Sequence, residues 1–219
     1  MLQKSTFSFL SLIKKNNNRD WFEKNKDKYL AAKDDMNRFI EELIKSFSSF
    51  DKSLADLKAK DCVFRIYRDV RFSKDKSPYK INMGASINAG GKAMEVAGYY
   101  IHVQPGKSFL AGGRWMPPAA DVKKIRQEID YNGKELRKIL NNKDFKKYFG
   151  DMDEEYKLSR PPKGYDKNHP DIELLKLSSY LVLHDYSDKE LLSKNFVKEV
   201  AKGAKIMKPF LDFLNTAVD

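Results

Sequence analysis

The chain has 219 residues, of which 41% are hydrophobic and 33% are charged, and its formal net charge at pH 7 is +11. This length fits one domain or at most two small ones, with enough apolar residues for a substantial core. No run of about 18 apolar residues occurs, so we expect no transmembrane helix and no membrane partner. The single cysteine, Cys62, excludes an intrachain disulfide and a cysteine-based zinc site, and it favours a reducing, cytoplasmic location.

The N-terminal third is predicted to be helical. Residues 6–15 have a helical apolar face. A secretory signal has its basic residues before the apolar stretch, whereas here the lysines follow it, so we expect a helix of the mature protein. Three asparagines at 16–18 favour a turn. A long helix is expected over 19–47, bent in its wholly polar middle at 24–28, followed by a connection over 48–60.

The middle of the chain is predicted to form strands. Residues 64–72 fit a helical face or a strand, and their β-branched and aromatic content favours extended structure. A strand would place Phe64, Ile66, Val70 and Phe72 on one face. Residues 73–78 are expected to be a loop, because Ser77 precedes a proline. Short turns separate the next strand candidates, which predicts an antiparallel meander over 81–89, 97–104 and 108–115.

The C-terminal half returns to helices and adds a last strand, predicted over 180–186. A final helix is expected over 193–216, bent or interrupted near Gly203 and Pro209. Other helices are predicted over 119–131, 133–140 and 143–149, with an irregular segment at 158–170. The predicted fold is a single α+β domain over 1–219, with an antiparallel sheet of about four to five strands packed with N-terminal and C-terminal helices.

Arginines are concentrated in one segment, residues 64–80, which reads FRIYRDVRFSKDKSPYK. The chain has nine arginines, and three of them lie inside one stretch of seven residues in this segment. Its 33 lysines, in contrast, are spread along the whole chain. Guanidinium groups bind phosphate and carboxylate in a bidentate manner, so the cluster indicates an anionic ligand more strongly than the net charge does. The candidate ligand-binding residues of this segment are Arg65, Arg68, Asp69, Arg71, Asp75, Lys76, Tyr79 and Lys80.

Two roles are open for the aspartates of this segment. Asp69 and Asp75 orient the arginines, or they act as a base or a metal ligand. The alternative for the whole cluster is a lattice of surface ion pairs that binds no ligand and stabilises the fold little.

Three further residues outside the segment are candidates for the same site. Arg114 follows two glycines at a predicted strand end, where the backbone can approach a ligand, although a β-bulge or a tight strand end is the favoured interpretation. His102 shares a strand face with Tyr100. His169 lies in the irregular segment, where a turn is a better explanation than a metal site.

Motifs for common chemistries are missing from the sequence. It contains no GxGxxG, GxxxxGK[ST], HExxH or GxSxG pattern, so no nucleotide loop, zinc-protease motif or serine nucleophile is predicted. We assign no metal, cofactor or catalytic residue, and the sequence predicts neither an enzyme class nor an oligomeric state.

The segment 64–80 is followed by GYYIHVQPGKSFLAGGRWMPP and later by RPPKGYDKNHPD, and the N-terminal FLSLIKKNNNRDWFEKNKDKYL precedes it. With these motifs, nearly the whole chain resembles a widespread family of conserved bacterial and fungal proteins known only as a domain of unknown function. The resemblance implies one intact α+β domain. It does not point to any particular activity, because none is established for the family. It covers the segment 64–80, and its other hallmark positions are Gly112, Gly113, Arg114, Lys163, Gly164, His169 and Pro170.

Our leading expectation is a cleft lined by arginine and lysine for a small anionic, phosphate-bearing ligand. Arg65, Arg68 and Arg71 bind the ligand, and hydrolase or transferase chemistry is compatible with such a site. The segment of Arg114 and the segment of His169 are expected to converge on the arginines. A non-catalytic module that binds nucleic acid or a protein is the alternative, and nucleic acid ranks below a small ligand because the aromatics alternate as core residues do.

Overall fold

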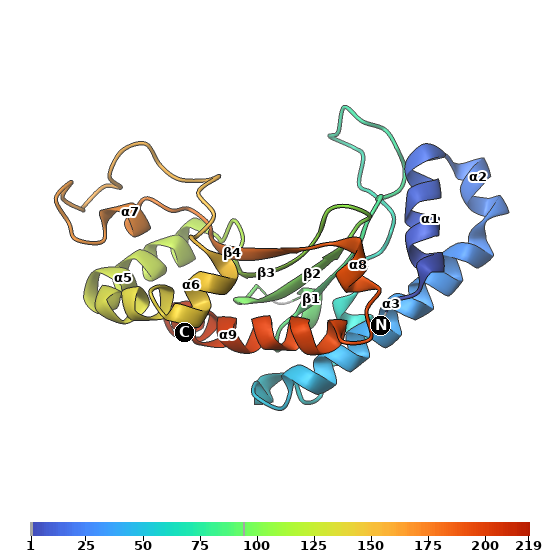
Figure 1. Cartoon of the computed structure of the whole chain (residues 1–219). Coiled ribbons are helices and arrows are strands. Elements are labelled where there is room, and N and C mark those ends of the chain that lie inside the picture. Colours follow the sequence, from blue (N-terminus) through green and yellow to red (C-terminus); the bar gives the residue numbers. More distant parts are fainter. Residues whose placement is uncertain (1, 94) are drawn as a thin grey trace. The chain divides into compact units, whose positions relative to one another are not determined.

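The computed structural model describes residues 2–93 and 95–219 and shows an α+β fold (Figure 1). The strands are β1 (Met83–Ile87), β2 (Gly98–Val103), β3 (Ser108–Arg114) and β4 (Tyr180–Tyr186). They form one antiparallel sheet in the order β1-β2-β3-β4. The fold class predicted from the sequence is therefore confirmed, with four strands in the sheet.

The helices are α1 (Lys4–Lys15), α2 (Arg19–Lys24), α3 (Lys26–Phe47), α4 (Ala59–Cys62), α5 (Ala119–Leu140), α6 (Lys143–Phe149), α7 (Ile172–Leu175), α8 (Asp188–Leu191) and α9 (Phe196–Thr216). Two short 3-10 turns, η1 (Lys52–Leu54) and η2 (Gly91–Ala93), lie in the connections.

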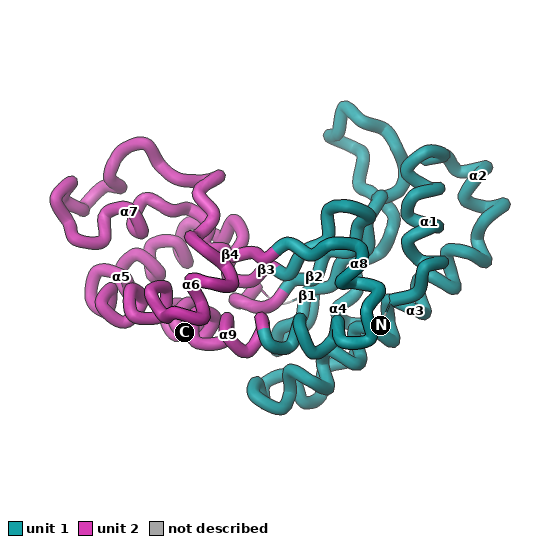
Figure 2. The backbone as a smooth tube through the Cα atoms, viewed as in Figure 1, with its two compact units in different colours: residues 1–94, 100–110, 185–202 teal, residues 95–99, 111–184, 203–219 magenta. Residues whose placement is uncertain are grey.

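The chain divides into two compact units (Figure 2). Unit 1 comprises residues 1–94, 100–110 and 185–202, and unit 2 comprises residues 95–99, 111–184 and 203–219. Each unit combines segments that are distant in the sequence, and strands β2, β3 and β4 each have residues in both. The prediction of a single domain over 1–219 stays a prediction.

In unit 1, α1 packs on α3, and both helices bury an apolar face. Asp35 of α3 is buried, and its carboxylate accepts hydrogen bonds from the Thr6 hydroxyl at 2.6 Å and from the Gln3 amide at 2.8 Å. A buried carboxylate is stable when such donors surround it, so this contact fixes the start of α1 on α3.

The helix predicted over 19–47 is two helices, α2 and α3. The break lies at Asn25, inside the polar stretch where a bend was expected, and Asn25 has non-helical angles of φ −119° and ψ 21°. Its side-chain amide donates to the Trp21 carbonyl at 2.9 Å, which satisfies a helix end that the break leaves open.

In unit 2, α5 continues through the boundary between two predicted helices but has non-helical angles at Asn132, so the predicted division is present as a kink. Helix α9 is continuous through Gly203 and Pro209. Gly203 serves packing there, because a Cβ atom at this position would lie 2.6 Å from the ring of Tyr148.

Strand β2 carries the clearest sequence pattern. Its side chains alternate between two faces: Tyr99, Ile101 and Val103 are almost completely buried, while Tyr100 and His102 point to the other face and are half-buried. This second face contributes to the candidate site.

Candidate functional site

The arginine-rich segment folds back on itself as an irregular hairpin within unit 1. The Arg68 amide donates to the Pro78 carbonyl at 2.9 Å, and the Lys80 amide donates to the Ile66 carbonyl at 2.7 Å. The pairing is antiparallel but consists of isolated bridges, so no regular strand forms. The predicted extended structure is therefore present only around residues 63–68 and 78–80, and residues 69–77 form the tip.

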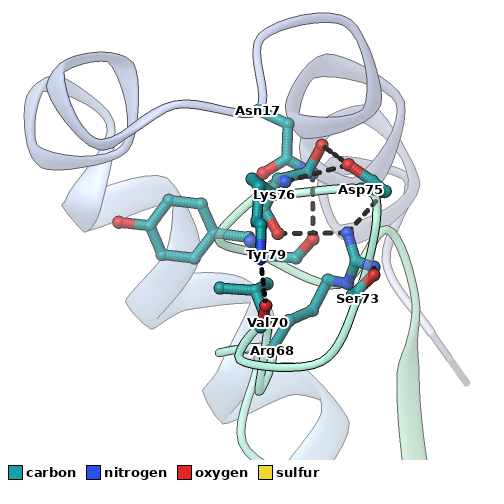
Figure 3. Close-up of polar contacts among 8 residues, drawn as sticks. Asn17, Arg68, Val70, Ser73, Asp75, Lys76 and Tyr79 are labelled. Carbon is teal, nitrogen blue, oxygen red and sulfur yellow. Dashed lines mark hydrogen bonds and ion pairs between the residues drawn. The ribbon is translucent and has the colours of Figure 1, made fainter.

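Tyr79 anchors this hairpin to the N-terminal helices. The Asn17 side chain donates to the Tyr79 carbonyl at 2.9 Å and accepts from the Tyr79 amide at 3.1 Å (Figure 3). The Tyr79 ring stacks on Phe22 with centroids 4.0 Å apart, and the residue is only 4% exposed. Burial raises the pKa of its hydroxyl. Tyr79, a predicted ligand contact, thus has a packing role in the structure.

Arg68 closes the tip of the hairpin. Its guanidinium donates to the Asp75 carboxylate at 2.5 Å, to the Ser77 carbonyl at 3.0 Å and to the Ser73 hydroxyl at 3.4 Å (Figure 3). Asp75 also accepts from the Ser77 amide and hydroxyl at 2.9 and 2.6 Å. The Ser77 hydrogen bonds, followed by that of Arg68, lower the pKa of Asp75 to about 2.

Arg71 and Asp69 form a second pair at the exposed surface. The guanidinium binds both carboxylate oxygens, with its closest distances at 3.0 Å to Oδ1 and 2.6 Å to Oδ2. Hydrogen bonds from Arg71 lower the pKa of Asp69, and the pKa of Arg71 rises in return. Lys76 donates from its ammonium group to the Val70 carbonyl at 3.0 Å. Both aspartates of the segment therefore orient arginines, as one of the two sequence hypotheses has it.

Lys80 and Arg65 differ from Arg68 and Arg71, because neither forms an ion pair with an acidic side chain within residues 2–93 and 95–219. The Lys80 ammonium lies over the Phe64 ring, 5.3 Å from its centroid. Burial, and secondarily the positive charge of Arg65, lower the pKa of Lys80. Arg65 also contributes to the lowered pKa of Asp69, so its charge acts on this same region.

A cavity of about 380 Å³ opens beside Lys80 within unit 1, and we call it the Lys80 pocket. Its lining combines cationic, amide and hydroxyl groups with two aromatic rings and one acid. The lining residues are Phe64, Arg68, Asp69, Lys80, Asn82, Gly84 and Tyr100.

A row of polar side chains runs from the pocket along β2. The Tyr100 hydroxyl lies 3.2 Å from His102 Nδ1, and His102 Nε2 lies 3.1 Å from Gln104 Oε1. The amide oxygen of Gln104 can only accept, which places the imidazole proton on Nε2 and leaves Nδ1 to accept from Tyr100. The imidazole is stacked on Phe109 at 4.7 Å, and burial lowers the pKa of His102 and raises that of Tyr100.

Gly84 of β1 makes room for Tyr100. A Cβ atom at this position would lie 2.5 Å from the Tyr100 hydroxyl oxygen, so any side chain here would displace that hydroxyl. Sequence reasoning missed Phe64, Asn82, Gly84 and Tyr100 as lining residues. The alternation along β2 placed Tyr100 on the face opposite the core, but only the pairing of residue 64 with residue 84 brings it to the pocket.

The remaining predicted site residues belong to unit 2 and have partners there. Arg114 is buried and forms an ion pair with Asp121 and a hydrogen bond to the Glu95 carbonyl. His169 lies 3.0 Å from the Asp130 carboxylate through Nε2 and accepts at Nδ1 from the Asp171 amide at 3.0 Å. Both ring nitrogens of His169 are thus engaged. The convergence of these segments with the arginines stays a prediction.

The glycines before Arg114 serve the packing of the sheet. Gly113 has φ 128°, and a Cβ atom there would lie 1.9 Å from the Tyr180 carbonyl oxygen of β4. At Gly112, a Cβ atom would lie 2.0 Å from the Met207 sulfur. These contacts agree with the tight strand end that the sequence favoured.

Within residues 2–93 and 95–219, no group of three or more histidine, cysteine, aspartate or glutamate side chains is arranged to hold a metal ion. None of the helices in this part combines the length and the apolar character needed to cross a bilayer.

Comparison with known proteins identifies the family but no activity. The family model described as conserved hypothetical protein (DUF2461) matches residues 5–213, and the chain therefore belongs to that family. No curated protein matches the chain. No solved structure matches it either.

Proposed function

We propose that this member of the DUF2461 family binds a small anionic, phosphate-bearing ligand in the Lys80 pocket. One observation carries the proposal: Lys80 lines a cavity but has no acidic partner within residues 2–93 and 95–219. A partly desolvated cation without a counter-ion is unfavourable, and an anionic ligand would relieve that cost through a charge-assisted hydrogen bond.

The surroundings of Lys80 favour an anion as well. Arg65 adds a second positive charge nearby that has no acidic partner among the described residues, and its charge acts on Lys80. Asp69 is the acid in the lining, but Arg71 binds both of its oxygens and offsets its charge. The segment 64–80 has six basic and two acidic residues, a formal charge of +4 by subtraction, which strengthens the positive potential at the pocket.

The size and polarity of the pocket limit the ligand to a small molecule. Its volume of about 380 Å³ lies at the lower end of the range for small-molecule sites, roughly 300–1,000 Å³. Asn82 and Tyr100 offer neutral hydrogen-bonding groups from the lining, and the Phe64 ring gives it an apolar wall. Arg68 lines the pocket too, but its guanidinium is engaged with the hairpin tip, so in this proposal it shapes the site and Lys80 binds.

A thermal-shift series tests the proposal. Wild-type protein is heated with inorganic phosphate, pyrophosphate and phosphorylated metabolites, together with Lys80→Met and the matched control Lys74→Met, whose lysine lies in the same segment and is exposed. A ligand at 100 times its Kd adds about 2.7 kcal/mol, which raises Tm by roughly 5–10 °C in a chain of this size. We expect that rise in the wild type and in Lys74→Met only. An equal rise in Lys80→Met, or no rise with any anion, would contradict the proposal.

A second candidate function rests on Phe72 at the hairpin tip. This residue is 96% exposed, and the Arg71 guanidinium lies 5.9 Å from its ring centroid. An exposed aromatic beside a cation is suited to stacking on a base of single-stranded nucleic acid. Fluorescence anisotropy with a labelled oligonucleotide would show salt-dependent binding that Phe72→Ser weakens, and binding unaffected by this substitution would remove the candidate.

A further inference from the structure

The Lys80 pocket combines an amine that has no acidic partner in the part of the chain that the structure describes, an aromatic wall and a hydroxyl that is bonded to an imidazole. We propose that Lys80 is a nucleophile that forms an imine with an aldehyde or ketone ligand carrying a phosphate or carboxylate group. Tyr100 is the proton-transferring group in this proposal, and His102 positions it. The inference rests on the proposed function, because the anion-binding character of the pocket selects the ligand.

Lys80 has the surroundings that a nucleophilic lysine needs. Only the neutral amine attacks a carbonyl carbon, and an ordinary lysine with a pKa of about 10.4 is almost wholly protonated at neutral pH. Burial, and secondarily the positive charge of Arg65, disfavour the ammonium form and lower the pKa of Lys80. The centroid of the Phe64 ring lies 5.3 Å from the amine, and the charged residues that share the pocket lining are Arg68 and Asp69, whose oxygens are bound by Arg71.

Tyr100 lies in the same lining and can move the protons of the reaction. Its hydroxyl donates to Nδ1 of His102, which leaves the lone pairs of the phenolic oxygen for a ligand in the pocket. His102 is itself held by Gln104 on one side and by the Phe109 ring on its face. The position of the hydroxyl is therefore determined by three side chains on the same face of the sheet and by the absence of a side chain at Gly84.

The reaction balances without a further reactant. Lys80 Nζ forms a bond to the carbonyl carbon while the electron pair of the C=O bond moves to oxygen. The carbon–oxygen bond then breaks, and the oxygen leaves as water. As the carbon–oxygen bond breaks, the lone pair of the nitrogen forms the second carbon–nitrogen bond of the imine. Both protons of the water come from the amine: in each transfer the Tyr100 O–H turns from His102 to the ligand oxygen and gives up its proton while the phenolic oxygen accepts one from the amine, so the hydroxyl is regenerated.

The two roles of Lys80 correspond to its two protonation states. As an ammonium group it attracts the anionic ligand, and as an amine it reacts with the carbonyl. Once the amine has lost its charge, Asn82 of the lining can still bind the phosphate or carboxylate group, and the positive charge of Arg65, which lies outside the lining, still attracts it. The ligand class is therefore a small 2-oxo acid or a phosphorylated aldehyde or ketone.

Reductive trapping tests this inference on the full chain. The protein is incubated briefly with pyridoxal 5′-phosphate, which carries both an aldehyde and a phosphate, reduced with borohydride, digested, and mapped by mass spectrometry. The 33 lysines of the chain compete in one sample. We expect Lys80 to be modified about tenfold faster than the exposed Lys74, and inorganic phosphate to slow Lys80 only. Modification of Lys80 at the rate of exposed lysines would overturn the inference.

Variants separate the roles and control for folding. In Tyr100→Phe, we expect the rate at Lys80 to fall about tenfold while the rate at Lys74 stays unchanged. His102→Gln should slow Lys80 less, because it removes only the positioning. An unchanged rate at Lys80 in Tyr100→Phe would overturn the assignment of Tyr100. The thermal-shift series and the labelling experiment can give different answers. If phosphate stabilises the wild type more than Lys80→Met, but Lys80 is not labelled faster than exposed lysines, the imine chemistry is refuted and the anion site stands.

Discussion

Asn17 offers a direct test of how the hairpin is anchored to the N-terminal helices. It lies 62 residues from Tyr79 in the sequence, but its side chain bonds both the amide and the carbonyl of Tyr79. Replacing Asn17 by alanine removes an N–H···O bond of 2.9 Å and one of 3.1 Å and leaves the amide and the carbonyl of Tyr79 without these partners. We expect the N-terminal helices and the hairpin to loosen together.

The size of this effect follows from the two hydrogen bonds and the burial. Each bond contributes about 1 kcal/mol, and a buried polar group that loses its partner costs about 1–3 kcal/mol. Tyr79 is 4% exposed, so water compensates poorly, and we expect a loss of about 2–4 kcal/mol. In a chain of this size, 2 kcal/mol lowers Tm by roughly 4–8 °C.

The assay combines thermal unfolding with hydrogen exchange. Asn16→Ala is the matched control, because the Asn16 side chain makes one exposed bond to the Leu12 carbonyl within its own helix. We expect Asn17→Ala, and not Asn16→Ala, to accelerate exchange at the amides of Tyr79 and Lys80. Equal stability and equal exchange in the two variants would refute the anchoring role of Asn17.

Three further predictions concern single side chains. Gly84→Ala should displace the Tyr100 hydroxyl and cost about 1–3 kcal/mol, measured by urea unfolding, and a neutral effect would show that the pocket wall is soft. Burial lowers the pKa of His102 in the folded chain below 6.5, so the unfolded chain takes up a proton at this imidazole first as the pH falls. The contribution of the neutral His102 ring to the free energy of unfolding is therefore present above about pH 6.5 and is lost as the pH falls below that value. An NMR titration should place the His102 pKa below 6.5, and a value above it would contradict the buried, neutral ring. Cys62 is completely buried, and its pKa is raised to about 12, chiefly by burial, so it should react with iodoacetamide only after denaturation, and rapid native labelling would contradict its burial.

The regular elements were predictable because their patterns are local. Strand β4 begins and ends at the predicted residues, and the alternation along β2 identified its buried face. The break at Asn25 was harder to predict, because two sequence signals disagree there. The helical spacing of apolar residues continues on both sides and suggests one helix, whereas an asparagine favours a helix end.

The hairpin illustrates where local patterns fail. Alternation placed Phe64, Ile66, Val70 and Phe72 on one face, yet Ile66 is 3% exposed and Phe72 is 96% exposed. This part of the prediction is wrong, because side chains of the tip bond to its own backbone and replace the regular ladder that alternation requires.

The arginine cluster was recognised from sequence, but its internal roles depend on distances that spacing does not give. Arg68 and Arg71 lie three residues apart and have similar chemistry, yet each has its own aspartate partner. What distinguishes Lys80 is the absence of such a partner in the described residues, 2–93 and 95–219, together with its place beside Tyr100 in the pocket lining.

The central claim is that the Lys80 pocket binds an anion, and locating a bound anion tests it most directly. Crystals soaked in tungstate, a phosphate analogue with strong anomalous scattering, would show where the anion binds. We predict an anomalous peak within hydrogen-bonding distance of Lys80 Nζ, beside Phe64 and Tyr100, that is lost in Lys80→Met. Peaks confined to other surfaces, or an unchanged peak in that variant, would contradict the account.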